Sequence, residues 1–156
     1  MGAAEAGLTA SSDQVMLTYG GLVGGPNHDC PDAAAPAGVE SLTIAGHQVT
    51  STGATGTGLL TLCIPRPDQL AAMPLSLGTN VKLVDVSGDV DTCHYEIERT
   101  RPVSGSASSH GMCGNGTDPA GFELVIDGGI SLTRTCAGVT DIVAVRLLGT
   151  IAVARQ

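Results

Sequence analysis

The chain has 156 residues and a formal net charge of −8, with Lys82 as its only lysine. An acidic surface repels phosphate groups, which argues against nucleic acid and anionic membranes as partners. The chain has no tryptophan and only two tyrosines, Tyr19 and Tyr95. Because sugars stack on flat aromatic rings, carbohydrate is also a poor candidate ligand.

This length corresponds to one domain, which buries roughly 70% of the surface of its unfolded chain. We place the domain at residues 14–156, after an N-terminal segment of residues 1–13. Phe122 is the only phenylalanine, so aliphatic side chains must fill the core. Dense β-branched aliphatics favour a pleated sheet, and 22 Gly and 8 Pro provide turns.

In the first half of the chain, apolar alternation predicts strands over residues 14–19, 39–45 and 47–52. A continuous apolar run predicts a buried strand over 59–64. Residues 20–38 are rich in Gly, Pro and Ala and are expected to form a long loop. A short helical turn is expected near residues 67–73, where Pro67-Asp68 can begin it and Pro74 ends it.

In the second half, strands are predicted at 81–86 and 90–99, on either side of Gly88. A second long loop is expected over 102–119. Strands at 122–126 and 130–136 flank Asp127-Gly128-Gly129, which is a hairpin signal. Residues 141–153 complete the chain as one long or two short strands, with a bulge expected at Gly149.

About nine to ten short strands separated by frequent turn signals predict an all-β fold. We expect an antiparallel β-sandwich or barrel. The longest apolar stretch, Ile142 to Ala154, contains Arg146 and is too short to span a bilayer, so no membrane span is predicted. The two long loops are the expected place for a local functional site.

Five cysteines stand apart along the chain with no C-x-x-C pair: Cys30, Cys63, Cys93, Cys113 and Cys136. This spacing favours disulfides between distant segments, and disulfides persist in oxidising compartments. We therefore expect a secreted or cell-envelope protein whose signal segment has been removed. The favoured bridges are Cys30–Cys63 and Cys93–Cys113, the alternative for Cys93 is Cys136, and one thiol remains unpaired.

Calcium is a possible ligand of the segment around residue 88. Asp85, Asp89, Asp91 and Glu96, with Ser87, place oxygen ligands at EF-hand-like spacing. Val90 occupies the position that requires glycine and the flanking segments are strands, so only a looser loop site is compatible. The simpler interpretation is a solvated acidic turn.

Zinc or thiol chemistry is a further possibility. Cys93 and His94, with His110 and Cys113, include the four ligands that zinc requires, but neighbouring strand residues point to opposite faces. Cys113 near His110 could act as a nucleophile if its thiol were free. His28 and Asp29 could form an acid–base pair in the first loop. There is no G-x-S-x-G motif.

These observations favour a non-catalytic role. The expected function is structural, adhesive or partner-binding, with a protein partner or self-association and no required cofactor. A calcium-stabilised binding module is one alternative. A metal- or thiol-dependent hydrolase using the histidines and Cys113 is the other, and whether the chain is an enzyme stays open at this point.

Overall fold

The computed structural model describes residues 7–26, 41–51, 57–67, 75–111, 114–115, 118–119 and 121–154. These residues form twelve β-strands and contain no α-helix. The strands are β1 (Gly7–Ser11), β2 (Met16–Pro26), β3 (Leu42–Ser51), β4 (Leu59–Ile64), β5 (Leu75–Ser76), β6 (Lys82–Val90), β7 (Cys93–Ile97), β8 (Ser104–Gly111), β9 (Gly114–Asn115), β10 (Asp118–Pro119), β11 (Gly121–Cys136) and β12 (Val139–Ala154). The expected all-β antiparallel fold is confirmed.

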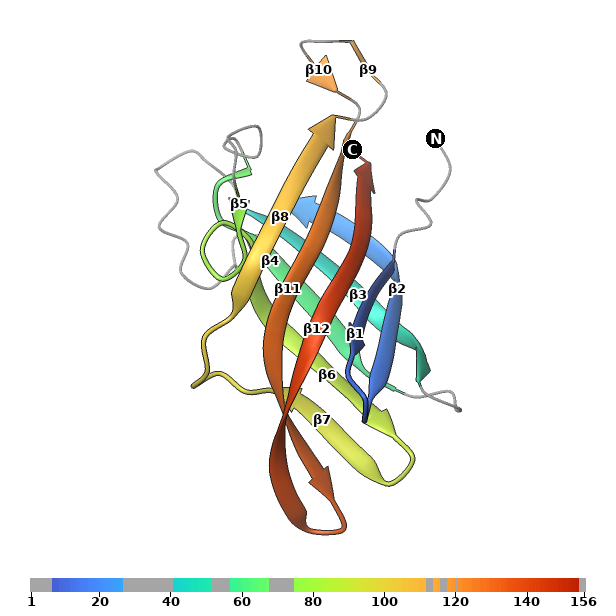
Figure 1. The fold of residues 1–156 in the computed structure, drawn as a ribbon. Helices are drawn as coiled ribbons and strands as arrows, with labels where there is room; N and C mark the ends of the chain where they lie inside the picture. Colours follow the sequence, from blue (N-terminus) through green and yellow to red (C-terminus); the bar gives the residue numbers. More distant parts are fainter. Residues whose placement is uncertain are drawn as a thin grey trace.

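Eight strands close into an antiparallel barrel, in the order β12-β1-β2-β3-β4-β6-β7-β11 (Figure 1). Closure depends on β12, which pairs with β1 on one side and with β11 on the other. The N-terminal half of β11 pairs with β8, and its C-terminal half pairs with β7. Two outer strands, β8 and β5, therefore extend the sheet beyond the barrel, to the left of β11 in Figure 1.

One end of the barrel carries the β1–β2, β6–β7 and β11–β12 turns, and we call this end the rim. The β11–β12 hairpin projects beyond the other strands there (Figure 1). Its turn is Ala137-Gly138, with φ of 49° and 81°. Positive φ at both central residues is typical of the type I′ turn, whose twist matches that of paired strands.

Alternate residues of the strands fill the barrel interior. On β12, Val143, Val145, Leu147 and Ile151 are buried, and the intervening residues of that strand are more exposed. The same period of two recurs around the barrel, because successive strand side chains point to opposite faces. Leucine, isoleucine and valine make up most of the core cluster, as the scarcity of aromatics requires.

The polar side chains of Tyr19 and Gln48 lie in this interior. Tyr19 is fully buried and its hydroxyl donates a hydrogen bond to the carbonyl oxygen of Ser87 at 2.8 Å. Burial, reinforced by the negative charge of Asp85, raises the pKa of the Tyr19 hydroxyl. The buried Gln48 amide lies 3.4 Å from the carbonyl oxygen of Asp89. Both side chains therefore tie β2 and β3 to β6 across the barrel.

The predicted hairpin at Asp127-Gly128-Gly129 is wrong, because β11 runs through these residues without a turn. A Cβ on Gly128 would lie 2.3 Å from Leu77 Cδ1 and 2.5 Å from the carbonyl oxygen of Ser104. The glycine thus permits close approach of the neighbouring backbone rather than chain reversal. The predicted bulge at Gly149 is also absent from the continuous β11–β12 register.

Gly88 lies within β6, and the chain turns at Asp91-Thr92 instead. The loop predicted over 20–38 begins as the end of β2, and the serine-rich segment of the second predicted loop forms β8. Residues Gly7–Ser11, assigned to the N-terminal segment, form β1 between β2 and β12. Residues 68–73 of the expected helical turn lie outside the described residues.

A search for membrane-spanning helices finds none of sufficient length and hydropathy in the described parts of the chain.

Candidate functional site at the barrel rim

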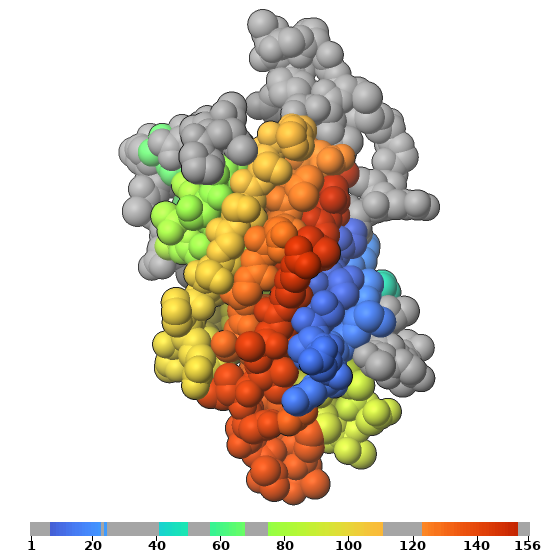
Figure 2. All heavy atoms as spheres, viewed as in Figure 1, coloured from blue at the N-terminus to red at the C-terminus, as the bar shows by residue number. Residues whose placement is uncertain are grey.

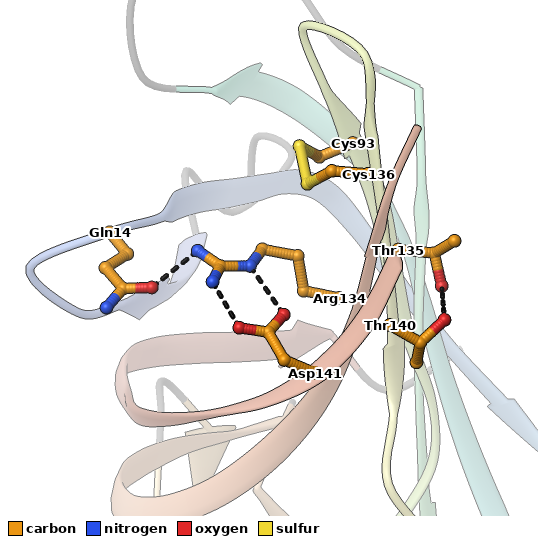
Figure 3. Close-up of a disulfide and its surroundings, with 7 residues drawn as sticks. All are labelled: Gln14, Cys93, Arg134, Thr135, Cys136, Thr140 and Asp141. Atoms are coloured by element: carbon orange, nitrogen blue, oxygen red, sulfur yellow. Dashed lines mark hydrogen bonds and ion pairs between the residues drawn. A yellow bond between two sulfur atoms is a disulfide. The ribbon is translucent and has the colours of Figure 1, made fainter. Parts of the chain in front are cut away.

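The rim carries the described disulfide, which joins Cys93 of β7 to Cys136 of β11 (Figure 3). The two residues are directly opposite in the strand register, with Cα atoms 4.3 Å apart. Such a short separation is typical of an antiparallel pair that exchanges no backbone hydrogen bonds. The bridge therefore fixes the point where the β11–β12 hairpin leaves the barrel.

This pairing overturns the favoured Cys93–Cys113 bridge and selects the alternative. It also removes Cys93 from the proposed zinc site, because a disulfide sulfur is not a thiolate ligand. Cys63 is disulfide-bonded too. Cys30 and Cys113 both lie outside the described residues, so the Cys30–Cys63 bridge stays a prediction.

Arg134 closes the rim beside the disulfide (Figure 3). Its Nε donates to Asp141 Oδ1 at 2.8 Å, and its two terminal nitrogens donate to Asp141 and to the Gln14 amide oxygen. Hydrogen bonds from Arg134 lower the pKa of the Asp141 carboxyl. Asp141 in turn raises the pKa of the guanidinium, with a smaller contribution from Tyr95. This network ties the β1–β2 loop to the β11–β12 hairpin.

Gln14 is positioned by Ser12, whose hydroxyl oxygen accepts the backbone N–H groups of Gln14 and Val15 at 3.1 and 3.2 Å. A shallow depression of about 230 Å³ lies beside this loop. Its walls come from Ser12, Asp13, Gln14 and the start of β12. Asp141 neutralises Arg134, and the Ser12 hydroxyl oxygen accepts backbone N–H groups of the loop. These contacts stabilise the rim, and they do not combine an acid, a base and a nucleophile in one site.

A second cluster lies on the outer wall of the same end. His94 Nδ1 is 2.8 Å from Asp89 Oδ1, and His94 Nε2 is 3.3 Å from Glu96 Oε1. Thr57 Oγ1 donates to the other Asp89 oxygen at 2.9 Å. The hydrogen bond with Asp89 raises the pKa of His94, and the same bond lowers the pKa of Asp89.

The structure thus brings together Asp89, Glu96 and His94 from the predicted set. Asp85 lies on the same outer face as Asp89 and four residues away, which is about 13 Å along a strand. Asp91 occupies the β6–β7 turn with φ of 54°. Both Asp89 oxygens already accept hydrogen bonds, and the described residues hold no metal-binding group of three or more His, Cys, Asp or Glu.

The other histidines do not join this cluster. His94 is opposite Thr135 on β11, whereas His110 is opposite Glu123 on the same strand. These positions are twelve residues apart, which is about 40 Å along β11. His28 and Asp29 lie outside the described residues. A hydrolase centre that combines His94 with His110 is therefore incompatible with the register.

The pKa shifts give a prediction for His94. Because the Asp89 contact raises the pKa of His94, this contact contributes its full stabilisation below the ordinary histidine pKa of 6.5. The contribution is lost as pH rises through the higher pKa of His94 in the folded protein. The lowered pKa of Asp89 means that the contact is also lost as pH falls below 3.8. We expect NMR titration to give His94 a pKa above 6.5 that falls in Asp89→Asn.

Asp91→Asn is the matched control, because Asp91 has the same charge in the adjacent turn. An equal fall of the His94 pKa in both variants would contradict the specific Asp89 contact. Since both partners are about half exposed, the effect on stability should be at most that of a surface ion pair, about 1 kcal/mol.

Comparison of the chain with protein-family models, with curated protein sequences and with solved structures gives no significant match. Functional inference therefore depends on the geometry described above.

Proposed function

We propose that this chain is a non-catalytic, extracytoplasmic β-barrel domain that acts by presenting its outer surface to a protein. The filled interior is the observation that carries this proposal. Leu8, Leu17, Ile44, Leu124 and Leu147 are all fully buried in the barrel. Small barrels either pack their interior with side chains or enclose a ligand there, and these aliphatic side chains favour the first case.

The disulfides support the extracytoplasmic part of the proposal. Cys93–Cys136 and the bridge at Cys63 are bonds that cytosolic reductants would remove in most cells. A protein partner is favoured over carbohydrate because both tyrosines are buried, with Tyr19 fully buried and Tyr95 3% exposed. Neither ring is therefore available for stacking on a sugar.

The test uses the protein in the cells that produce it. Intact cells are treated with a membrane-impermeant biotin reagent, and free thiols are alkylated before lysis. We expect the protein in the biotinylated or secreted fraction, with Cys93 and Cys136 unalkylated by peptide mass spectrometry. An intracellular protein with both thiols alkylated would refute the proposal. A cytosolic enzyme of known compartment, followed in the same samples, controls for cell integrity.

A further inference from the structure

The first part of β12 lacks a neighbouring strand on one side. The pairing of β12 with β1 ends at Arg146, which is opposite Ser11. Beyond Ser11 the chain turns away, and the Ser12 N–H donates to the carbonyl oxygen of Val15. Among the described residues, no strand pairs with residues 139–145 on the side opposite β11. We call this segment of β12 the open edge.

The strand register identifies the backbone groups that face the open side. Cys136 and Val139 flank the two-residue turn and are opposite each other, so they form a hydrogen-bonded pair. Hydrogen-bonded and non-hydrogen-bonded pairs alternate along an antiparallel ladder, so every second residue of β12 counted from Val139 bonds to β11. The residues between them, Thr140, Ile142 and Ala144, therefore direct their N–H and C=O groups to the open side.

The open edge lacks the features that usually protect an edge strand. It contains no proline and no lysine, and its register with β11 continues without a bulge. Its only charged residue, Asp141, is bound by Arg134. Five of its seven residues are β-branched, a composition that favours strand pairing. An unprotected row of N–H and C=O groups is a template for a further strand.

The shallow depression at the rim follows the open edge. Residues 141–144 form one of its walls, and Ser12, Asp13 and Gln14 of the β1–β2 loop form the other. Figure 2 shows this loop, in blue, against β12, in orange to red, and the β11–β12 hairpin extends past the loop at the bottom of the view. The depression thus begins beside the edge at which a further strand would pair.

We propose that the open edge binds an extended, basic segment of a partner protein, which adds to the sheet as a further strand beside β12. Main-chain hydrogen bonds to Thr140, Ile142 and Ala144 hold the segment. The Ile142 side chain, which is 43% exposed, packs against an apolar side chain of the added strand. This inference rests on the proposed function and names the kind of protein partner.

Charge favours a basic segment. The chain has a net charge of −8, which attracts cationic partners and repels anionic ones. Asp13, on the loop wall of the depression, is exposed and forms no ion pair within the described part of the chain. The Arg134 guanidinium offers no free positive charge to an acidic segment, because Asp141 binds it.

The length of the open edge predicts weak binding. Seven strand residues extend over about 23 Å, and only three of them direct backbone groups to the open side. These contacts must offset the entropic cost of ordering an extended segment. We therefore expect a reversible complex.

The test is NMR of the purified, oxidised chain with a peptide of about eight alternating valine and lysine residues, which matches the length of the edge. In the free protein, the amide protons of Thr140, Ile142 and Ala144 should exchange with solvent faster than those of Asp141 and Val143, which bond to β11. Near saturation with the peptide, exchange of the first three should slow at least about fivefold.

Ile142→Pro removes the central N–H of the open edge and places a ring where the added strand would lie. This N–H faces the open side, so no hydrogen bond to β11 is lost, and proline is tolerated at such a position of an edge strand. The peptide Kd should rise at least about tenfold. Ile142→Val keeps the N–H and a β-branched side chain, so its Kd should stay within about threefold of the wild type.

Circular dichroism checks the folding of each variant. If Ile142→Pro does not fold, Ala144→Pro replaces it, because the Ala144 N–H also faces the open side. Charge gives an independent readout: Asp13→Asn and added NaCl should each weaken binding of the valine–lysine peptide. A peptide of alternating valine and glutamate should bind more weakly than the valine–lysine peptide.

Unchanged exchange of the three edge amides with the peptide, or equal binding by Ile142→Pro and Ile142→Val, would overturn this inference. So would slowing of the same amides that grows with protein concentration without peptide, because a second copy would then occupy the edge. The proposed function fails separately. An extracytoplasmic protein with intact disulfides whose edge ignores the peptide keeps that function through another surface, whereas an intracellular protein refutes it whatever the peptide does.

Discussion

Replacing both rim cysteines in Cys93→Ala/Cys136→Ala is expected to lower the free energy of unfolding by about 4 kcal/mol. The bridge joins residues separated by 43 positions, and the loss of loop-closure entropy in the unfolded chain is large for a loop of this length. Because small domains have a total stability of about 5–15 kcal/mol, this would be a large fraction of it.

The measurement is urea unfolding of the double variant without reductant, so that the bridge at Cys63 stays intact. Reducing the wild type would not isolate the rim, because Cys63 is also disulfide-bonded. Cys93→Val/Cys136→Val is the control, since it keeps an apolar cross-strand pair and removes only the covalent bond. A loss below about 1 kcal/mol in both variants would show that the strand pairing alone fixes the rim.

Local apolar patterns were sufficient to predict several strands. The strand expected at 59–64 is β4 with the same bounds, Leu59–Ile64. The alternation expected for the neighbouring residues Cys93 and His94 is also seen along β7, where Tyr95 is buried and His94 and Glu96 are exposed. These features depend on neighbouring residues along the chain, and the period of two is visible in a short window of sequence.

Strand pairing could not be read from the sequence in the same way. Barrel closure depends on contacts between β1 and β12, at opposite ends of the chain. The disulfide pairing depends on β7 being next to β11, and several pairings of five cysteines are compatible with the sequence. Barrel and sandwich also share the same alternation, so only the pairing of the end strands distinguishes them.

The candidate site was predicted only in part for a related reason. Asp89 and Glu96 were selected by their spacing along one segment, but they lie on the adjacent strands β6 and β7, where both contact His94. Thr57, which binds Asp89, carries no sequence signal because the contact crosses between segments. Arg134 and Asp141 did carry one: they are equidistant from Ala137-Gly138, so recognition of that two-residue turn would have paired them.

The second large effect is expected at Gly128, where the sequence predicted a turn and the structure has a strand. Gly128→Ala should destabilise the fold by about 3 kcal/mol, the upper range for overpacking. The added Cβ would lie 2.3 Å from Leu77 Cδ1 and 2.5 Å from the carbonyl oxygen of Ser104. Leu77 can change rotamer, but the Ser104 carbonyl belongs to β8 and can move only if that strand separates from β11.

Gly138→Ala is the matched control, because Gly138 occupies a real turn with φ of 81° and no atom within 4 Å of an added Cβ. Its cost is backbone strain alone, about 1–2 kcal/mol. Urea unfolding of the two variants thus separates steric contact from φ preference. If residues 127–129 formed a hairpin, residue 128 would be exposed at the tip of a turn. Gly128→Ala would then lower the free energy of unfolding no more than Gly138→Ala does. A clearly larger loss at 128 requires a backbone packed against that glycine, which is the arrangement of β8 on β11.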